Sequence, residues 1–237
     1  MEWREHSGVR WLEADLGGAT AAFSTRLGGV SEPPFDHLNL GLSTDDTEEA
    51  VVENRRRLAA ALGFEVDQIV FARQVHGTRL LDHRTEGHGG LVEADGHLIS
   101  EPGTAPLVFV ADCLPVALAG PGGVAMVHAG WRGLAGGILA AAADAVEAKV
   151  AAIGPGIGPC CYEVGEEVLS AFADLGEGVA EGRMLDLPEA ARRSLASAGV
   201  ERTESAGLCT SCEKELFFSH RRDRGHTGRQ AGTAWLS

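Results

Sequence analysis

Three residues in the central part of the chain, His76, Cys113 and His128, carry side chains that bind transition metals. Each stands at an end of a short apolar run whose length and composition are typical of a β-strand. Two imidazoles and one thiolate, with a fourth position left open, form the ligand arrangement of catalytic zinc, whose bound water ionises near neutral pH. Their irregular spacing does not itself select a metal. A metal site at these three residues is therefore one hypothesis that the pattern supports.

The same residue types are compatible with two other roles for Cys113. In the first, the thiolate attacks a substrate, one histidine acts as its base, and the second histidine or Asp112 orients that base. In the second, Cys113 is a small core residue without chemistry, which is a common fate of cysteine. The pattern of residues leaves both alternatives open beside the metal site.

Arg132 stands directly before an alanine-rich stretch, residues 134–146, that predicts a helix. Free amide N–H groups and the dipole at a helix N-terminus favour a bound anion, and the guanidinium adds a bidentate donor for phosphate or carboxylate. The alternative is that Gly130 and Gly133 only permit a tight turn from strand to helix, while Trp131 fills the core.

A second arginine, Arg26, lies in a glycine-rich segment flanked by hydroxyl side chains, residues 24–31. Such a turn can form a nest of backbone N–H groups for an anion. The segment is not a P-loop, because no Gly-Lys-Ser/Thr follows it. An ordinary loop with a surface arginine is the alternative. We predict Arg26 and Arg132 as phosphate ligands.

A β-hairpin is expected to position the central residues. Residues 114–119 and 124–128 are short enough to be strands, and the link Gly120-Pro-Gly-Gly123 is a turn signal. The outer ends of a hairpin lie side by side. Cys113 and His128 should therefore meet at one edge of a sheet.

Other elements surround this hairpin. The segment 68–75 is strand-like and leads to His76, and the acidic, glycine-rich loop Glu86–Gly96 is expected to border a site. Asp45 and Asp46 offer an N-cap for a helix that Gly63 ends. The other predicted strands are residues 9–16, 19–25, 149–153 and the tail up to Leu236, and the predicted helices are residues 47–62, 165–175 and 188–198.

Length, composition and charge limit the possible functions. The 237 residues are 44% hydrophobic, which is enough to bury a full core, and no linker divides them, so we expect one domain over residues 1–237. The formal charge of −14 argues against binding nucleic acid or an anionic membrane, and an anionic small substrate would need a local positive pocket. The N-terminus lacks the apolar core of a signal peptide, so a cytoplasmic protein is expected. Nothing in the sequence indicates an oligomeric state.

The cysteines point to reduced thiols. There are five, and Cys160 and Cys161 are adjacent, which is poor geometry for a mutual disulfide. Cys209 and Cys212 have the spacing of half a zinc knuckle, but no second Cys-x-x-Cys pair or suitably spaced histidine pair accompanies them. We interpret them as structural or as the rim of a loop.

Eight ordered segments together resemble the laccase-domain family, from about Phe23 to Trp235. That family was long labelled polyphenol oxidase and is now described as purine nucleoside phosphorylases, and a bacterial branch is called peptidoglycan editing factor. The matching segments are residues 24–31, 39–41, 74–77, 111–116, 128–133, 157–164, 209–212 and 227–229.

The resemblance implies a fold, a cofactor and an activity. The implied fold is a single α+β domain in which mixed β-sheets are sandwiched by outer helices in four layers, α/β/β/α. The residues matching His76, Cys113 and His128 would hold zinc, with copper as the other possible metal. The implied activity is phosphorolysis of adenosine, inosine, guanosine and methylthioadenosine together with adenosine deamination. Asn39 lies in one matching segment and joins Arg26 and Arg132 as a candidate ligand for substrate or phosphate.

Two rival functions follow from the same resemblance. An editing hydrolase would remove a wrongly incorporated amino acid from a UDP-muramoyl precursor, using the same cysteine and histidines. The oxidase label fits the chain less well, because multicopper oxidases use repeated His-x-His pairs and none of the nine histidines is so placed. A scaffold without activity would leave the three candidate ligands and two arginine-bearing loops unused.

Overall fold

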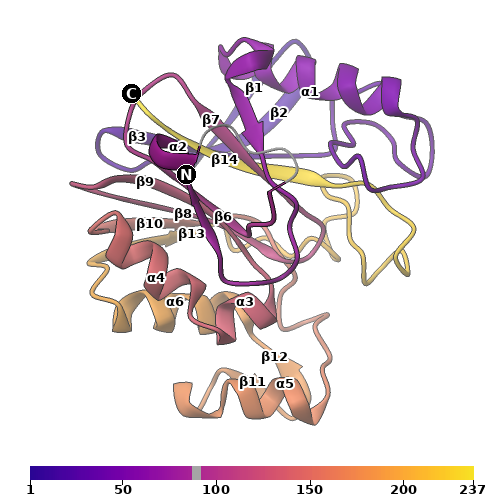
Figure 1. Ribbon diagram of the computed structural model, residues 1–237. Helices are drawn as coiled ribbons and strands as arrows, with labels where there is room; N and C mark the ends of the chain where they lie inside the picture. The colour runs from indigo at the N-terminus through magenta and orange to yellow at the C-terminus, as the bar shows by residue number, and fades with distance from the viewer. Residues whose placement is uncertain (87–91) are drawn as a thin grey trace.

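The computed structural model describes residues 1–86 and 92–237. Within them, two six-stranded mixed sheets pack face to face and helices cover their outer faces (Figure 1). The first sheet has the order β1 (Glu2–His6), β2 (Val9–Asp15), β3 (Ala19–Ser24), β14 (Gln230–Leu236), β7 (Ala105–Val110), β4 (Ile69–Phe71). The second has the order β13 (Arg202–Ser205), β10 (Val150–Ile153), β8 (Leu114–Gly120), β9 (Gly123–Ala129), β6 (Gly96–Ile99), β5 (Leu80–Asp82).

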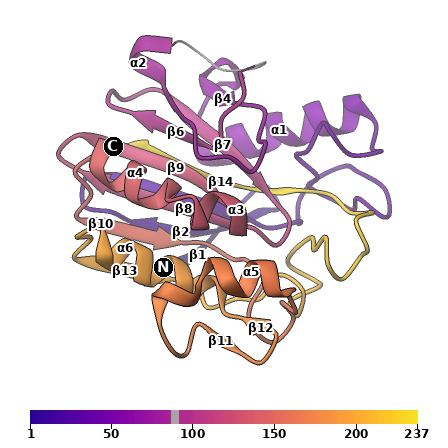
Figure 2. The same ribbon diagram turned by 60° about the horizontal axis from the view of Figure 1, so that its bottom comes forward.

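The helices divide between the two outer faces. The first sheet is covered by α1 (Glu48–Leu62), and the second by α4 (Ile138–Ala145) and α6 (Leu187–Ser197) (Figure 2). This arrangement confirms the expected α+β fold with four layers. The short elements are α2 (His83–Glu86), α3 (Trp131–Ala135), α5 (Glu166–Ala171), the 3-10 turns η1 (Val66–Gln68) and η2 (Ala173–Leu175), and the ribbon β11 (Ala180–Glu181) with β12 (Met184–Leu185).

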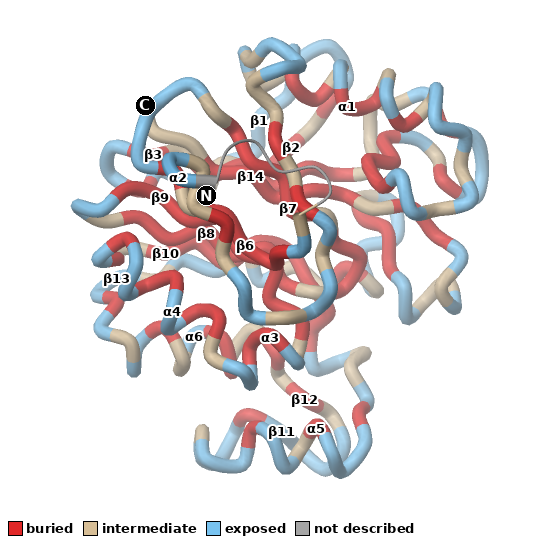
Figure 3. The backbone as a smooth tube through the Cα atoms, viewed as in Figure 1, coloured by how far each residue is buried: buried red, intermediate tan, exposed pale blue. Residues whose placement is uncertain are grey.

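Because side chains alternate along a strand, the second sheet contributes residues to two hydrophobic cores, one on each of its faces. On β8, Val116 and Leu118 face the helices while Ala117 and Ala119 face the first sheet. Small residues on the inner face let the two sheets approach closely. At Gly232 of β14, an added Cβ would lie 2.6 Å from Cβ of Pro115. The buried residues accordingly follow the strands of both sheets (Figure 3).

The predicted hairpin is present. β8 and β9 pair antiparallel from Leu114 opposite Ala129 to Gly120 opposite Gly123. The predicted strand pair of residues 9–16 and 19–25 corresponds to β2 and β3, which also pair antiparallel. The strand expected at residues 68–75 is shorter, because regular pairing is limited to β4 and is followed by one bridge between Arg73 and Glu93.

Several helix boundaries differ from the predictions for identifiable reasons. The helix expected at residues 134–146 is two helices, α3 and α4, because Gly137 has φ +87° and breaks the helical path. The N-cap of α1 is Thr47, whose hydroxyl accepts from the amide of Ala50, and neither predicted aspartate fills that place. The helix expected at residues 165–175 stops at Ala171 and continues only as η2.

β1 was not predicted, because all five of its residues are exposed and show no apolar alternation. Residues 87–91 of the predicted loop Glu86–Gly96 lie outside the described residues. Among the described residues, no helix combines the length and the apolar composition that crossing a bilayer requires.

Candidate active site and metal centre

His76, Cys113 and His128 come together as predicted from the hairpin. One ligand atom from each lies within 4.8 Å of the others. Sγ of Cys113 is 4.0 Å from Nε2 of His76, and the two imidazole rings meet edge to face with centroids 4.8 Å apart. His128 lies on β9 opposite Pro115, two residues along from Cys113. It shares a strand face with Met126, so the cluster stands at the end of the layer between the sheets.

A fully buried carboxylate, Asp95, holds both histidines. Its Oδ1 accepts from Nδ1 of His128 at 2.8 Å and from the amide of His76 at 2.9 Å. Its Oδ2 accepts from the amides of Val75 at 3.1 Å and Gly77 at 2.7 Å. These three backbone bonds hold His76 at φ +59°, a conformation that non-glycine residues seldom adopt. A carboxylate on Nδ1 also leaves Nε2 of His128 as the ligand atom.

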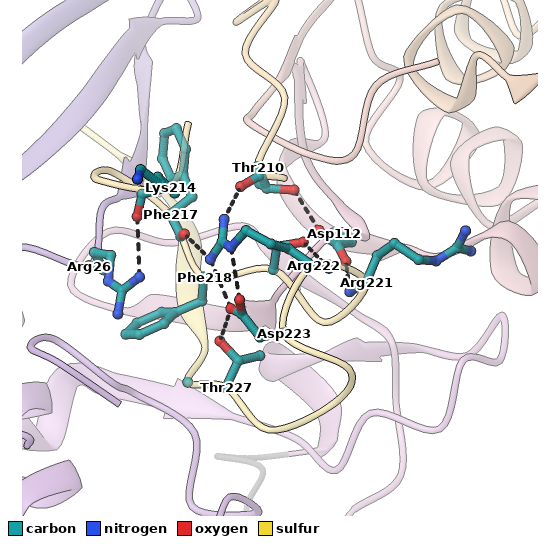
Figure 4. A network of polar contacts seen from close by, with 12 residues as sticks. Arg26, Asp112, Thr210, Lys214, Phe217, Phe218, Arg221, Arg222, Asp223 and Thr227 are labelled. Atoms are coloured by element: carbon teal, nitrogen blue, oxygen red, sulfur yellow. Dashed lines mark hydrogen bonds and ion pairs between the residues drawn. The ribbon is translucent and has the colours of Figure 1, made fainter. Parts of the chain in front are cut away.

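Asp95 replaces Asp112 in the role of orienter. Asp112 was considered for that role because it adjoins Cys113, but its carboxylate is occupied elsewhere. Oδ1 of Asp112 accepts from the hydroxyl of Thr210 and Oδ2 from the amide of Arg221, each at 2.7 Å (Figure 4). Asp112 therefore ties the C-terminal segment to the site and contacts neither histidine through these bonds. Sequence reasoning missed Asp95, because an aspartate before a strand carries no distinctive local signal.

Gly130 provides a test of whether a metal fits. A Cβ added there would lie 3.1 Å from Sγ of Cys113, 3.1 Å from Cδ2 of His76 and 3.8 Å from Cε1 of His128. The absence of a side chain at this point keeps open the space that the three ligands face. Two imidazole nitrogens and one thiolate suit zinc or copper. The residues present thus fit the expected metal, whose identity the donor set leaves undecided between these two ions.

Electrostatics give the cluster a definite charge state in the absence of metal. Burial raises the pKa of the Cys113 thiol, but His128 and His76 beside it bring that pKa down to about 6. Burial lowers the pKa of His128, while Cys113 and Asp95 raise it to about 9. Between these values a thiolate stands beside an imidazolium. Such a pair binds a metal cation when it releases the histidine proton, and it also has the form of an activated nucleophile.

Arg132 lies at the rim of this cluster. It is exposed, its guanidinium stacks 4.3 Å over the ring of Trp131, and α3 begins one residue before it. α3 has five residues, so its dipole contributes less to anion binding than the predicted longer helix would. Of the two predicted contributions to anion binding, the guanidinium is thus the larger one that the structure offers.

Two residues that sequence reasoning did not select, Tyr162 and Arg229, also surround Cys113. Burial raises the pKa of Tyr162 to about 12, and the negative charge of Cys113 adds to this while Arg221 and Arg132 oppose it. Burial lowers the pKa of Arg229, against the raising effect of Cys113 and Asp112. Both residues belong to segments of the family resemblance, which was the available signal for finding them.

Arg26 lies in a different place. Its Nε donates to the backbone carbonyl of Asp36 at 2.6 Å, and its guanidinium forms an ion pair with the side-chain carboxylate of Asp36 at 3.1 Å. The guanidinium also stacks 4.5 Å over the ring of Phe218. Another nitrogen donates to the carbonyl of Lys214 (Figure 4). Arg26 faces a cavity of about 440 Å³, and His76, Cys113 and His128 are not among its lining residues. We place the chemistry at the ligand cluster, because the cavity lacks those three groups.

Asn39 is fully buried and its amide is engaged within the protein. Nδ2 donates to Thr44 and Asp46, both at 2.9 Å. Oδ1 accepts from the amides of Gly41 at 3.1 Å and Arg229 at 2.8 Å. Asn39 therefore acts on the site indirectly, by holding the backbone of Arg229 in place.

Curated proteins similar to this chain are found over nearly its whole length. The chain is 43% identical over 232 residues to the purine nucleoside phosphorylase YfiH of Shigella flexneri, covering 92% of this chain and 94% of that protein. It is 39% identical over 251 residues to the purine nucleoside phosphorylase YlmD of Geobacillus stearothermophilus, covering 92% of each.

Solved structures give the same result. The crystal structure of the hypothetical protein YfiH of Bacillus licheniformis superposes with a TM-score of 0.90 at 34% identity, covering 99% of both chains. The structure of YlmD from Geobacillus stearothermophilus gives 0.87 at 36% identity, covering 98% of this chain and 97% of that one. The model of the family described as multi-copper polyphenol oxidoreductase laccase matches residues 20–237. The chain therefore belongs to this laccase-domain family, whose relatives named here from Shigella and Geobacillus are called purine nucleoside phosphorylases.

Proposed function

We propose that the chain is a zinc-dependent purine nucleoside phosphorylase that accepts adenosine, inosine, guanosine and methylthioadenosine and also deaminates adenosine. The observation that carries the proposal is the cluster of His76, Cys113 and His128, oriented by Asp95, in a chain whose relatives are named for this activity. Zinc bound by these residues would supply a Lewis acid for polarising a substrate oxygen or activating water.

The residues around the cluster suit phosphorolysis. In this reaction a phosphate oxygen bonds to C1′ of the ribose as the bond from C1′ to the purine nitrogen breaks, and the purine leaves with a proton. Arg229 carries positive charge near Cys113, and Arg132 carries it near Tyr162, where such charge would favour a bound phosphate. Tyr162, with a pKa of about 12, keeps its proton at neutral pH and would be able to donate a hydrogen bond to a substrate.

The three predicted ligands of substrate or phosphate take different parts in this proposal. Arg132 contacts phosphate directly. Asn39 acts by positioning Arg229. Arg26, which is already paired with Asp36, stabilises the loop around it and faces a cavity without the metal ligands. Arg132→Ala should therefore raise the Michaelis constant for phosphate far more than that for nucleoside, and Arg26→Ala should not.

The decisive experiment is incubation of the zinc-loaded protein with inosine, with and without phosphate. Hypoxanthine should appear only with phosphate, together with an equal amount of ribose 1-phosphate. Cys113→Ala is the matched control and should form neither product. Release of hypoxanthine without phosphate would identify a hydrolase and overturn the proposal. With adenosine, water should replace the amino group at C6, and inosine and ammonia should form in equal amounts.

A cysteine hydrolase of the editing kind is the second candidate. The observation in its favour is the Cys113 thiolate beside the His128 imidazolium, with pKa values of about 6 and 9. Such an enzyme would cleave the amide in a UDP-muramoyl precursor and would keep its activity after chelation of the metal. A copper-dependent oxidase, by contrast, would consume oxygen with a phenol. Nucleoside, muropeptide and phenol assays on the same sample separate the three.

A further inference from the structure

The other four cysteines converge on one point, although they lie in two distant parts of the sequence. Cys160 and Cys161 belong to the loop that follows β10, and Cys209 and Cys212 to the loop that follows β13. All four Sγ atoms lie within 4.8 Å of one another. The sequence pattern did not reveal this grouping, because Cys160 and Cys161 are adjacent and do not form a second Cys-x-x-Cys pair. Cys209 and Cys212, interpreted from the sequence as structural or as the rim of a loop, thus have Cys160 and Cys161 as neighbours.

The topology explains the convergence. β10 and β13 are parallel neighbours in the second sheet, so the loops after them leave from the same edge. A bridge between Gly156 and Cys209 joins the two loops, with the amide of Thr210 donating to the carbonyl of Gly156 at 3.0 Å. A tight turn then brings Cys212 back, with its amide donating to the carbonyl of Cys209 at 3.1 Å.

The sulfur positions match a tetrahedral ion. Four thiolates bound to zinc at about 2.3 Å lie about 3.8 Å from one another. Here Sγ of Cys212 is 3.5 Å from Sγ of both Cys160 and Cys161, and the whole set stays within 4.8 Å. The amide of Gly158 donates to Sγ of Cys209 at 3.3 Å, a contact that favours a thiolate. Since Cys212 is equally close to two partners, these positions do not select one disulfide.

We propose that Cys160, Cys161, Cys209 and Cys212 form a second metal site, a closed tetrathiolate centre that holds zinc for a structural purpose. Four protein ligands leave no open position, which is typical of structural zinc and distinguishes this centre from the three-ligand cluster. The ion joins the two loops at the edge of the second sheet.

The contacts of Thr210 indicate what this centre supports. Thr210 lies between Cys209 and Cys212, and its hydroxyl donates to Asp112, the neighbour of Cys113. Its carbonyl accepts from the guanidinium of Arg222 at 2.9 Å (Figure 4). The amide of Ile157, in the other loop, donates to the carbonyl of Asp112 at 2.8 Å. The tetrathiolate centre therefore fixes both loops that hold the residue before Cys113.

Counting metal by elemental analysis tests the proposal without any activity assay. The wild-type chain, purified under reducing conditions and saturated with zinc, should hold two zinc ions. The double variant Cys209→Ser/Cys212→Ser should hold one, and Cys113→Ala should also hold one. The two variants thus remove different ions, and failure of the proposed phosphorylase activity would not alter these counts.

Cobalt distinguishes the two centres by spectrum. Cobalt bound by four thiolates should give strong sulfur-to-metal charge-transfer bands and tetrahedral visible bands that persist in Cys113→Ala and disappear in the double cysteine variant. If the double variant is insoluble, Cys160→Ser, which keeps three ligands, should lose zinc to a chelator more readily than wild type. A single zinc in wild type that Cys113→Ala removes completely would overturn the proposal. So would a disulfide among the four cysteines found by mass spectrometry of the freshly purified, metal-loaded chain.

Discussion

At the scale of single residues, Asp95 sets the geometry of the two histidine ligands. One oxygen contacts both the ring of His128 and the backbone of His76, and the other contacts the amides on either side of His76. A carboxylate on Nδ1 makes Nε2 a better donor to a metal, and the backbone bonds fix where the His76 ring stands. The ligand set is thus organised before any ion binds.

Replacing Asp95 with asparagine should weaken zinc binding at the cluster of His76, Cys113 and His128 by about 10- to 100-fold. The amide keeps the shape of the carboxylate but loses one acceptor and the negative charge. Competition with a chromophoric chelator measures this. Asp112→Asn is the matched control: it changes a neighbouring carboxylate that bonds Thr210 and Arg221, and it should retain most of the zinc affinity. Equal affinities in wild type and Asp95→Asn would refute the role of Asp95.

Residue type and strand position were enough to select His76, Cys113 and His128 as candidates, because each carries a recognisable ligand atom, and the family resemblance then favoured the metal site over its alternatives. Asp95 could not be predicted in this way. Its partner His128 lies 33 positions away and its backbone partners 18 to 20 positions away. A contact made across that distance leaves no local pattern, and only the folded sheet reveals it.

At the scale of elements, β6 carries a buried histidine next to the site. His97 stacks on His83, with ring centroids 5.1 Å apart, and the rings share a hydrogen bond of 2.8 Å. Burial, together with the charge of His83, lowers the pKa of His97 to about 3, while Asp95 partly opposes this. The folded chain therefore keeps His97 neutral over a wide range of pH.

This shift predicts a loss of stability in acid. Because the folded pKa of about 3 lies below the ordinary value of 6.5, the unfolded chain binds the proton more readily. The contribution of His97 is complete above pH 6.5 and falls as the pH drops towards 3. We expect the free energy of unfolding, measured with urea, to fall less between pH 7 and pH 4.5 for His97→Gln than for wild type. The exposed His6→Gln is the control and should behave as wild type.

Local elements were predictable where the signal was local. The Gly120–Gly123 link fixed the β8–β9 hairpin, and with it the meeting of Cys113 and His128. The break at Gly136 and Gly137 lies inside a stretch whose alanines and other apolar residues favour one continuous helix. The pairing of the two cysteine loops depends on β10 and β13 being parallel neighbours, and a parallel pair needs a long crossover that hides the relation in sequence.

At the scale of the whole molecule, the close approach of the two sheets is a packing requirement. Beside Gly232, an added Cβ would lie 2.5 Å from Cε of Met126 and 2.6 Å from Cβ of Pro115. Methionine can move, but the proline on β8 is held in the sheet. Their proximity explains why a residue without a side chain occupies the centre of β14.

Gly232→Val should therefore destabilise the protein by about 1–3 kcal/mol through overpacking between the sheets. Chemical denaturation measures the difference. Thr233→Val is the control on the adjacent position, because the buried hydroxyl of Thr233 has no hydrogen-bond partner among the described residues, and its loss should be neutral or stabilising. An unchanged stability in Gly232→Val would show that the sheets can separate without cost.

Two of the three proposed metal ligands lie where the chain passes from one sheet to the other. His76 lies between β4 of the first sheet and β5 of the second, and Cys113 lies between β7 of the first and β8 of the second. Both are on crossings from one sheet to the other, and His128 belongs to the second sheet. An ion bound by these residues would cross-link the β4–β5 and β7–β8 connections to strand β9. Since a ligand that binds only the folded state stabilises it, removing a metal from the proposed site should lower the stability of the packed sheets as well as the proposed activity.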